Sequence, residues 1–179
     1  MPRQERIKYL RLLREQHRRK CLKSLLHFTY TFWDLIEPGQ PYEHGWHIQS
    51  ACQHLEAAAD FRLLELIINW PPRHMKSILV NVMFPAWVWA HEEWASRRFM
   101  TASYAASLSI RDGLKMRIII ESERYQELFR PTWAMKSDQN QKIKFENTKS
   151  GFRFSTSSHL FAISCGKTAG RNVQKRWNQ

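Results

Sequence analysis

The residues with the clearest chemical potential are Lys76 and Ser77, which stand directly before an apolar segment of helical length, Ile78 to Ala90. When a lysine and a serine begin a helix after a tight loop, the lysine can reach the β- and γ-phosphates of a nucleotide and the serine hydroxyl can hold Mg²⁺. The loop and the first helical turn add backbone N–H groups and the positive end of the helix dipole. This pattern predicts a site for a nucleoside triphosphate and its Mg²⁺ ion.

A strand must position this loop, and the preceding residues have the composition of one. Residues 64–69, Leu-Glu-Leu-Ile-Ile-Asn, form a short apolar run with β-branched members, which is typical of a buried strand. Pro71 and Pro72 cannot continue a central strand, so the chain must leave the sheet there. The phosphate-site interpretation therefore requires residues 64–69 to lie in a sheet and the Lys76 amine to point to a hollow that can hold phosphates.

The loop departs from the standard phosphate-binding pattern, which is Gly, four residues, and then Gly-Lys-Ser or Gly-Lys-Thr. Trp70 or Pro71 stands at the first glycine position, and Met75 stands at the second. Glycine is favoured there because it accepts a positive φ and lets the backbone approach phosphate. The alternative interpretation is a plain turn between a strand and a helix, with a solvated lysine.

Several motifs in one order make the chain similar to a known family. Pro-Pro-Arg-His-Met-Lys-Ser (71–77) is followed by Phe-Pro-Ala-Trp (84–87), and this pair resembles the ATPase motor of tailed-phage terminase large subunits. The resemblance covers roughly residues 28–158 and implies an α/β fold of the P-loop NTPase type, with a partial sheet flanked by helices. The further matches are Tyr42–Ile48, Ala102–Tyr104, Tyr125–Phe129 and Gly151–Ser157.

The resemblance also implies what the family does and where. Terminase motors use ATP and Mg²⁺ to drive double-stranded DNA into a viral procapsid, in the cytoplasm of the bacterial host. Their partners are the terminase small subunit and the portal protein. They assemble as rings, and whether this chain forms a homo-oligomer stays open. The implied source is a bacteriophage or a degraded prophage.

By the same resemblance, Lys76 and Arg73 are the candidate catalytic residues. A terminase loop arginine contacts the γ-phosphate region, where a guanidinium can pair with two phosphate oxygens and stabilise developing charge. Ser77 is the candidate ligand of Mg²⁺, which it would hold together with ATP. Alternatively, Arg73 is a surface residue that caps a turn, and His74 only shapes the loop. The candidate cofactor-binding residues of the loop are Pro72, Arg73, His74, Met75, Lys76 and Ser77.

An adenine-contacting segment lies upstream of the phosphate loop in this family. By resemblance, His47 and Gln49 are candidates for contacting the adenine edge, and Trp46 is a candidate for packing near it. A glutamine offers both a donor and an acceptor, which an adenine edge needs. The alternative is a helix N-terminus with a histidine that has its own hydrogen-bond partner.

Charge and motifs divide the chain into a basic helical lead (1–40), a partial ATPase domain (41–158) and a divergent basic tail (159–179). The net charge is +12, and residues 1–24 carry nine Lys or Arg against two Glu, while the tail carries four Lys or Arg and no acid. Basic ends suit contact with nucleic acid phosphates. A solvated basic helix without a partner has the same composition. Hydrophobic spacing predicts two helices in the lead, Arg3–Lys23 and about Leu25–Ile36.

The remaining elements are predicted from periodicity and from turn residues. We expect a helix through Leu55 to about Ala59, a strand near 97–104, a helix over Ala105–Glu121, an irregular segment over Tyr125–Trp133, and a hairpin of Lys142–Asn147 with Gly151–Thr156. Pro85 is expected to kink the helix after the loop or to end its regular part. The apolar face of the long helix is assigned to Leu108, Leu114, Ile118 and Ile119.

The resemblance ends after Ser158. Family members continue with a glycine-rich stretch and an apolar strand that ends in paired acids, which bind Mg²⁺ and polarise the attacking water, and this sequence contains neither. Cys165-Gly166-Lys167-Thr168 mimics a phosphate loop but has Phe161 at the first glycine position, so we attribute it to chance. We therefore interpret the chain as a truncated terminase large subunit that alone hydrolyses ATP weakly or not at all. A frameshift and a split gene are equally compatible with the tail.

Two interpretations from other classes remain open. The first is a basic nucleic-acid-binding module without enzymatic activity, and the second is a non-functional prophage remnant that does not fold stably. Composition excludes other classes: no apolar run approaches the length of a membrane span, and no secretory signal follows the basic start. Cys21, Cys52 and Cys165 are odd in number and widely spaced, which predicts neither a disulfide framework nor a zinc site and favours a reducing cytoplasm.

Overall fold

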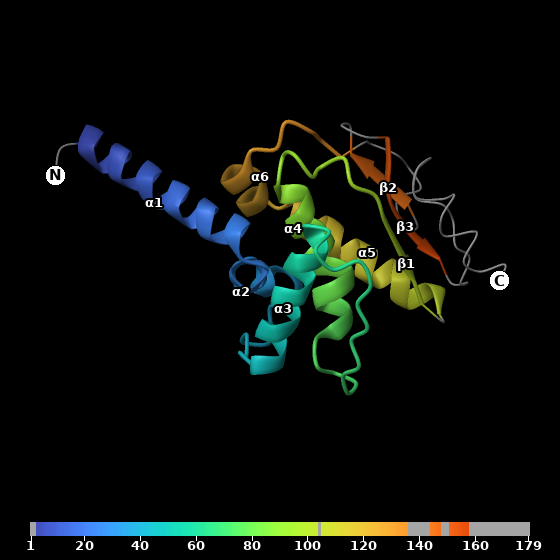
Figure 1. The fold of residues 1–179 in the computed structure, drawn as a ribbon. Coiled ribbons are helices and arrows are strands. Elements are labelled where there is room, and N and C mark those ends of the chain that lie inside the picture. The colour runs from blue at the N-terminus through green and yellow to red at the C-terminus, as the bar shows by residue number, and fades with distance from the viewer. Residues whose placement is uncertain (1–2, 104, 136–143, 148–150, 158–179) are drawn as a thin grey trace.

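The computed structural model describes residues 3–103, 105–135, 144–147 and 151–157 (Figure 1). None of the described helices is both long enough and apolar enough to cross a membrane. The elements, in chain order, are α1 (Arg3–Lys23), α2 (Leu25–Ile36), α3 (Trp46–Ala59), a π-helix η1 (Ile78–Met83), α4 (Phe84–Ala90), β1 (Phe99–Ala102), α5 (Ala106–Glu121), α6 (Glu123–Phe129), β2 (Lys144–Asn147) and β3 (Gly151–Ser157).

The first two helices have the predicted bounds, and Ser24 separates them. Its hydroxyl accepts a hydrogen bond from the His27 N–H (3.4 Å), which caps the start of α2. The Glu56 carboxylate of α3 accepts another from the Leu25 N–H (2.7 Å), so a second N–H group at this helix start has a partner. We call residues 17–31, where the two helices meet, the α1–α2 corner. N-terminal to Arg14, which pairs with Glu127 of α6 (3.1 Å), α1 projects away from the rest of the molecule (Figure 1).

α2 lies in the centre of the core because one of its faces is aromatic and fully buried. The rings of Phe28 and Phe32 lie 4.6 Å apart and approach those of Tyr125 and Phe129 with centroid distances between 5.9 and 6.4 Å. Burying each such side chain contributes about 1.5–3 kcal/mol. The Tyr125 hydroxyl donates to the Ala86 carbonyl (3.0 Å), so α6 is joined to α4 through the same cluster.

The strands form one small mixed sheet in the order β1-β3-β2. β1 runs parallel to β3 with Phe99 opposite Phe154, and β2 runs antiparallel to β3 with Phe145 opposite Phe154. α5 packs against β3. The strand predicted near 97–104 and the predicted hairpin are therefore confirmed. The described chain is mostly helical, with this one three-stranded sheet, and it does not show the larger sheet of a P-loop NTPase.

The strand predicted over residues 64–69 is wrong. This segment has no regular secondary structure, and Leu64 and Ile67 are 82% and 94% exposed. It does have the alternation of an extended chain, because Leu66, Ile68 and Trp70 are partly buried against the core while the residues between them face solvent. Within the described ranges no strand pairs with it. The sequence pattern indicated an extended backbone correctly, but hydrogen-bonded pairing needs a neighbouring strand that local sequence does not specify.

Two further predictions need correction. The segment Tyr125–Trp133 is not irregular throughout: Ser122 accepts a hydrogen bond from the Tyr125 N–H (3.2 Å) and begins α6, which ends at Arg130 in the left-handed region. On α5, Leu114 and Ile118 are 38% and 51% exposed. The buried residues of α5 are Ser109, Asp112, Gly113, Met116, Ile119 and Ile120.

A buried carboxylate explains why the apolar face of α5 was misassigned. Asp112 is 3% exposed and accepts hydrogen bonds from the Asn81 side chain (3.2 Å) and from the Arg111 guanidinium (2.8 Å). These partners offset the cost of removing the charge from water. A polar residue therefore occupies the helix face that hydrophobic spacing alone gives to leucine and isoleucine. The tail 159–179, including Cys165–Thr168, lies outside the described residues, as does Tyr104.

Candidate phosphate-binding loop

The loop between Pro71 and Met75 turns the chain from the extended segment into a helix that begins at Lys76 (Figure 1). Arg73 and Met75 both have a left-handed backbone, with φ of 68° and 61°. A residue with a β-carbon adopts this conformation at a cost of about 1–2 kcal/mol. Met75 stands where the phosphate-binding pattern has its second glycine. The loop therefore has the backbone that a glycine would favour at this position, although the residue is a methionine.

Lys76 and Ser77 occupy the first turn of the helix, and the side chains of both are exposed. The Met75 carbonyl accepts a hydrogen bond from the Leu79 N–H (2.8 Å), so the loop and the helix start share a closed turn. Arg73 is exposed as well. The three residues predicted to contact phosphates and Mg²⁺ therefore stand within five positions of one another at a helix start that is open to solvent.

The helix after the loop begins with wide π-type turns because Pro85 follows. Proline has no N–H, and its ring would collide with the carbonyl four residues earlier in a regular α-helix. In η1 the bonds span five residues, as from the Phe84 N–H to the Leu79 carbonyl, and regular α4 follows to Ala90. Pro85 therefore stands in the first turn of the regular helix α4 and does not end its regular part, although the sequence analysis allowed that outcome. Trp87, Val88 and Trp89 of α4 are buried and anchor the helix that carries Lys76.

The predicted adenine segment does lie beside the loop. His47, in the first turn of α3, approaches the Trp70 ring at 5.1 Å and the His74 ring at 5.8 Å, in edge-to-face arrangements. His74 is held in turn by the Pro72 carbonyl, which accepts a hydrogen bond from its Nδ1 (2.9 Å). Gln49 is exposed on the same helix. The structure thus brings His47 to the loop, and it adds Trp70, which the sequence analysis had not assigned to the site.

Gly45 determines where the His47 ring can lie. It is the N-cap of α3, and a β-carbon at this position would stand 2.4 Å from one carbon of the His47 ring and 2.7 Å from Nδ1. Such distances are below van der Waals contact. The absence of a side chain at Gly45 therefore leaves room for the ring to fold back over the helix start.

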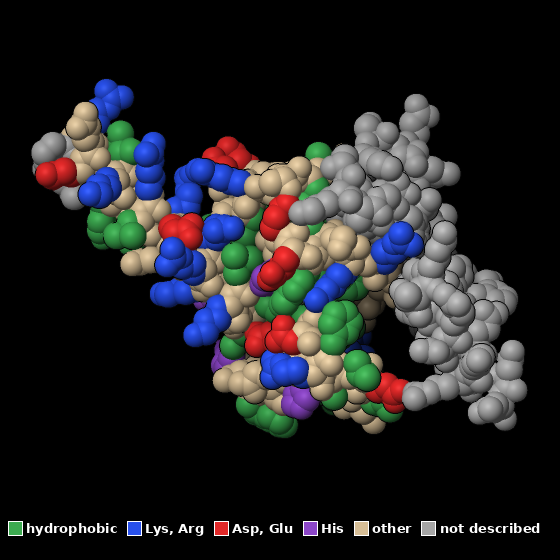
Figure 2. All heavy atoms as spheres, turned by 45° about the horizontal axis from the view of Figure 1, so that its top comes forward, with side chains coloured by type: hydrophobic (Ala, Val, Ile, Leu, Met, Phe, Trp, Pro, Cys, Tyr) green, Lys and Arg blue, Asp and Glu red, His purple; other side chains and the backbone are tan. Residues whose placement is uncertain are grey.

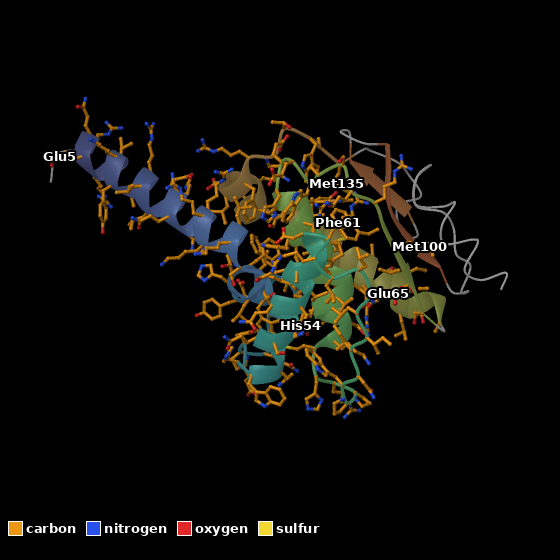
Figure 3. The ribbon with its side chains drawn as sticks, viewed as in Figure 1. Glu5, His54, Phe61, Glu65, Met100 and Met135 are labelled. Carbon is orange, nitrogen blue, oxygen red and sulfur yellow. The ribbon has the colours of Figure 1, made fainter. Side chains whose placement is uncertain are left out.

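A hollow of about 190 Å³ lies between α3 and the extended segment, next to the loop. It is smaller than the roughly 300–1,000 Å³ of a typical small-molecule pocket. Figure 3 places His54, one of its lining residues, on α3. Lys76 and Ser77 do not line it. Its lining residues are Trp46, His47, Ser50, Ala51, His54, Leu66, Ile67, Ile68, Asn69 and Trp70.

The first requirement set by the sequence is not met, and the second is not met by the hollow beside the loop. Residues 64–69 lie outside the sheet, and the described hollow adjoins the loop without reaching Lys76. No family model, no curated protein and no solved structure matches this chain. The arguments for a site are therefore the backbone conformation of residues 73–77 and the contacts of His47.

Proposed function

We propose that, although residues 64–69 lie outside the sheet and the hollow does not reach Lys76, this chain is the nucleotide-binding part of a terminase-type DNA-packaging motor, and that residues 72–77 bind the phosphates of ATP. The observation that carries the proposal is the left-handed Met75, at the glycine position of the motif, directly before a helix that begins with Lys76 and Ser77. In this proposal Lys76 contacts the β- and γ-phosphates, Arg73 contacts the γ-phosphate, and the Ser77 hydroxyl is the ligand that this loop offers to Mg²⁺.

The base is proposed to lie against α3. His47 stands beside Trp70 and His74, so an adenine ring near the small hollow is within reach of both the loop and the first turns of α3. Gln49 is exposed on the same helix and has the donor and the acceptor that the base edge needs.

We expect weak binding and little or no turnover from this chain alone. Among the residues that the structure describes, no strand pairs with the extended segment before the loop, so the loop is less preorganised than in a complete sheet. The sequence also contains no apolar strand ending in paired acids, and phosphoryl transfer needs acids that hold the metal and orient the water.

Titration with a fluorescent ATP analogue in the presence of Mg²⁺ tests the site. The unmodified chain is expected to bind it, and Lys76→Ala is expected to abolish binding. Lys23→Ala is the matched control, because Lys23 is an exposed lysine at the C-terminal end of α1 and should leave binding unchanged. Equal binding by all three proteins would refute the proposed phosphate site. Steady-state turnover of about 1 s⁻¹ or more, an ordinary enzyme rate, would contradict the expected inactivity.

A second candidate function, contact with double-stranded DNA, is favoured by the form of α1. This helix projects from the body, with Glu5 near its free end (Figure 3), and Lys and Arg side chains stand along it (Figure 2). Phosphate contacts of this kind weaken steeply as salt rises. DNA binding by the helix is therefore expected to fall with salt and to survive Lys76→Ala. Binding that is indifferent to salt would exclude it. A small subunit, a portal protein and a ring of copies are further partners that the resemblance implies.

A further inference from the structure

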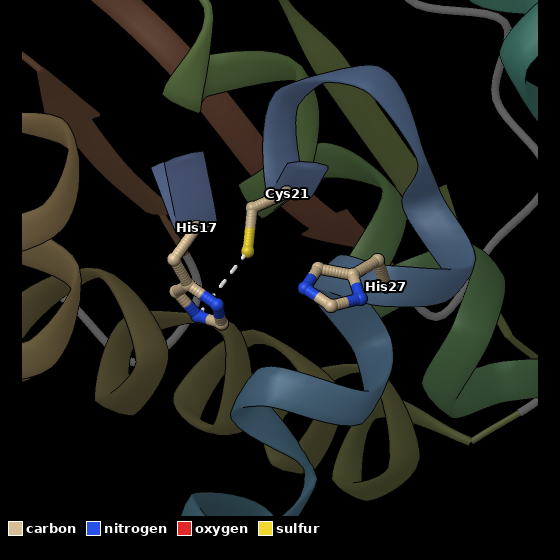
Figure 4. Close-up of side chains that lie close together, drawn as sticks. All are labelled: His17, Cys21 and His27. Carbon is tan, nitrogen blue, oxygen red and sulfur yellow. Dashed lines mark hydrogen bonds between the residues drawn. The ribbon is translucent and has the colours of Figure 1, made fainter. Parts of the chain in front are cut away.

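Three metal-binding side chains meet at the α1–α2 corner. His17 and Cys21 lie on α1, His27 lies on α2, and one ligand atom from each lies within 4.8 Å of the others. The Cys21 sulfur is 3.7 Å from His17 Nε2, and Figure 4 shows the His27 ring turned toward them. Within the described residues this is the only such group of histidine, cysteine and acidic side chains.

The local fold explains why these residues converge. His17 and Cys21 are four positions apart, so they share one face of α1. Ser24 then ends α1 and caps α2, which turns the chain and returns His27 to the same point. The two imidazole rings lie 5.2 Å apart in an edge-to-face arrangement. The corner is anchored to the core, because the Cys21 carbonyl accepts a hydrogen bond from the Trp87 indole N–H (2.9 Å).

One polar atom at this corner lacks a partner. His27 Nε2 is buried and has no hydrogen-bond partner among the described residues. A buried polar atom without a hydrogen bond lowers the stability of the fold by about 1–3 kcal/mol, so its presence in a folded chain requires an explanation. The Thr31 hydroxyl donates to the His27 carbonyl (2.9 Å) and lies 3.5 Å from both the Cys21 sulfur and His17 Nε2. It does not satisfy the His27 ring, but it does add an oxygen beside the cluster.

We propose that His17, Cys21 and His27 bind a Zn²⁺ ion, with a water in the fourth position next to Thr31. Zn²⁺ takes cysteine sulfur at about 2.3 Å and histidine nitrogen at about 2.0–2.1 Å, and a tetrahedral arrangement then separates the sulfur and a nitrogen by roughly 3.5 Å. The 3.7 Å between Cys21 Sγ and His17 Nε2 is close to this value. Two imidazoles and one thiolate are a donor set that suits Zn²⁺, whereas Mg²⁺ and Ca²⁺ prefer oxygen ligands.

Burial and the neighbouring charges both affect how readily this site binds a cation. Burial lowers the pKa of His17 and of His27, which favours neutral imidazoles, but it raises the pKa of the Cys21 thiol, which opposes the thiolate that a metal needs. Lys20 stands near both rings and Arg124 near His17, so the cation must bind beside two positive side chains. The Cys21 thiol loses its proton when the metal binds, and the thiolate offsets part of that repulsion. The ion would tie α1 to α2 and fix the direction in which α1 projects. This proposal is independent of nucleotide binding.

The test uses the full chain after its metal has been removed with a chelator. Calorimetric titration is expected to show one Zn²⁺ per chain with a dissociation constant of about 1 µM or tighter. Titration with Co²⁺ is expected to produce the near-ultraviolet absorption of a cobalt–thiolate bond. A dissociation constant near 1 mM, or cobalt binding without the thiolate band, would overturn the proposal.

Variants locate the site. Cys21→Ser and His27→Gln are each expected to weaken Zn²⁺ binding at least tenfold, and Cys21→Ser is expected to abolish the thiolate band. Cys52→Ser and His54→Gln are the matched controls, because they change a buried cysteine and an exposed histidine on α3 and should leave binding intact. Thermal unfolding of each metal-free variant verifies its fold. If Cys21→Ser does not fold, the half-buried His27→Gln carries the test, and unchanged binding by it would refute the site.

Discussion

The α1–α2 corner and the phosphate loop differ in how firmly the fold holds their chemical groups. At the corner, Cys21 has no exposed surface, and its neighbours are fixed by capping hydrogen bonds and by the aromatic core behind them. In the loop, Lys76 and Ser77 are exposed at the helix start. A sequence motif indicates the loop as a candidate site, whereas the only sequence signal at the corner is the spacing of His17 and Cys21. A motif preserves residue types, whereas burial is what fixes their geometry.

The largest expected effect is a loss in the free energy of unfolding when the core behind the corner is changed. Phe32 is fully buried behind the corner and contacts the rings of Phe28, Tyr125 and Phe129. Phe32→Ala is expected to lower the free energy of unfolding by about 3–5 kcal/mol, because it removes the burial and leaves a cavity. Urea unfolding measures this change.

The matched control for that variant lies in the extended segment before the loop. Ile67 is 94% exposed, so Ile67→Ala is expected to change the free energy of unfolding by less than about 0.5 kcal/mol. A loss of 2 kcal/mol or more at Ile67 would mean that this segment is paired or covered, and the contrast with the corner would fail.

A smaller effect tests the strained backbone of the loop. Met75 has φ of 61°, where alanine is strained and glycine is not. Met75→Gly is therefore expected to be more stable than Met75→Ala by about 1 kcal/mol. At Arg11, in the exposed middle of α1, glycine should instead be less stable than alanine by about 0.5–1 kcal/mol. Alanine outranking glycine at both positions would show that the loop is not left-handed at Met75.

Much of the helical part could be predicted from the sequence. The bounds of α1 and α2 and the extent of α5 follow from apolar spacing and from stop signals, such as the Pro38-Gly39 pair after α2. Ser122, a good N-cap residue, precedes α6 and is a signal for this helix. The sequence analysis instead predicts an irregular segment there, because of the aromatic residues that follow. β1 and the β2–β3 hairpin were predicted from alternation, but the parallel pairing of β1 with β3 is a long-range choice that alternation cannot reveal.

The sites were harder to predict than the elements. The buried strand predicted over residues 64–69 is wrong, because whether such an apolar segment joins a sheet depends on a partner elsewhere in the chain. The number and spacing of the cysteines alone predict no zinc site, and the site proposed at the corner includes two histidines. The spacing of His17 and Cys21, one turn apart on the same helix, was the available signal, but His27 joins them only after Ser24 turns the chain.

The last prediction concerns the pH dependence of stability at His91, which packs beside the α1–α2 corner. His91 packs against the Trp87 and Trp94 rings, and its two ring nitrogens lie 2.9 and 3.0 Å from the carbonyls of Trp87 and Leu22. Burial lowers the pKa of His91. The two carbonyls raise it, but the effect of burial is larger. The folded chain therefore binds a proton at His91 less readily than the unfolded chain does.

The sign of the effect follows from that difference. The stabilising contribution of neutral His91 is fully present above the ordinary histidine pKa of about 6.5, and it is lost as the pH falls through the lowered folded-state pKa. Urea unfolding of the unmodified chain should therefore lose more stability between pH 7.5 and pH 5.5 than His91→Gln does. Trp94→Phe is the control, because it disturbs the same stacked rings without removing a titrating group. If His91→Gln and the unmodified chain lose equal stability on acidification, His91 is not held neutral by burial, and the packing that joins α4 to the corner is looser than its contacts indicate.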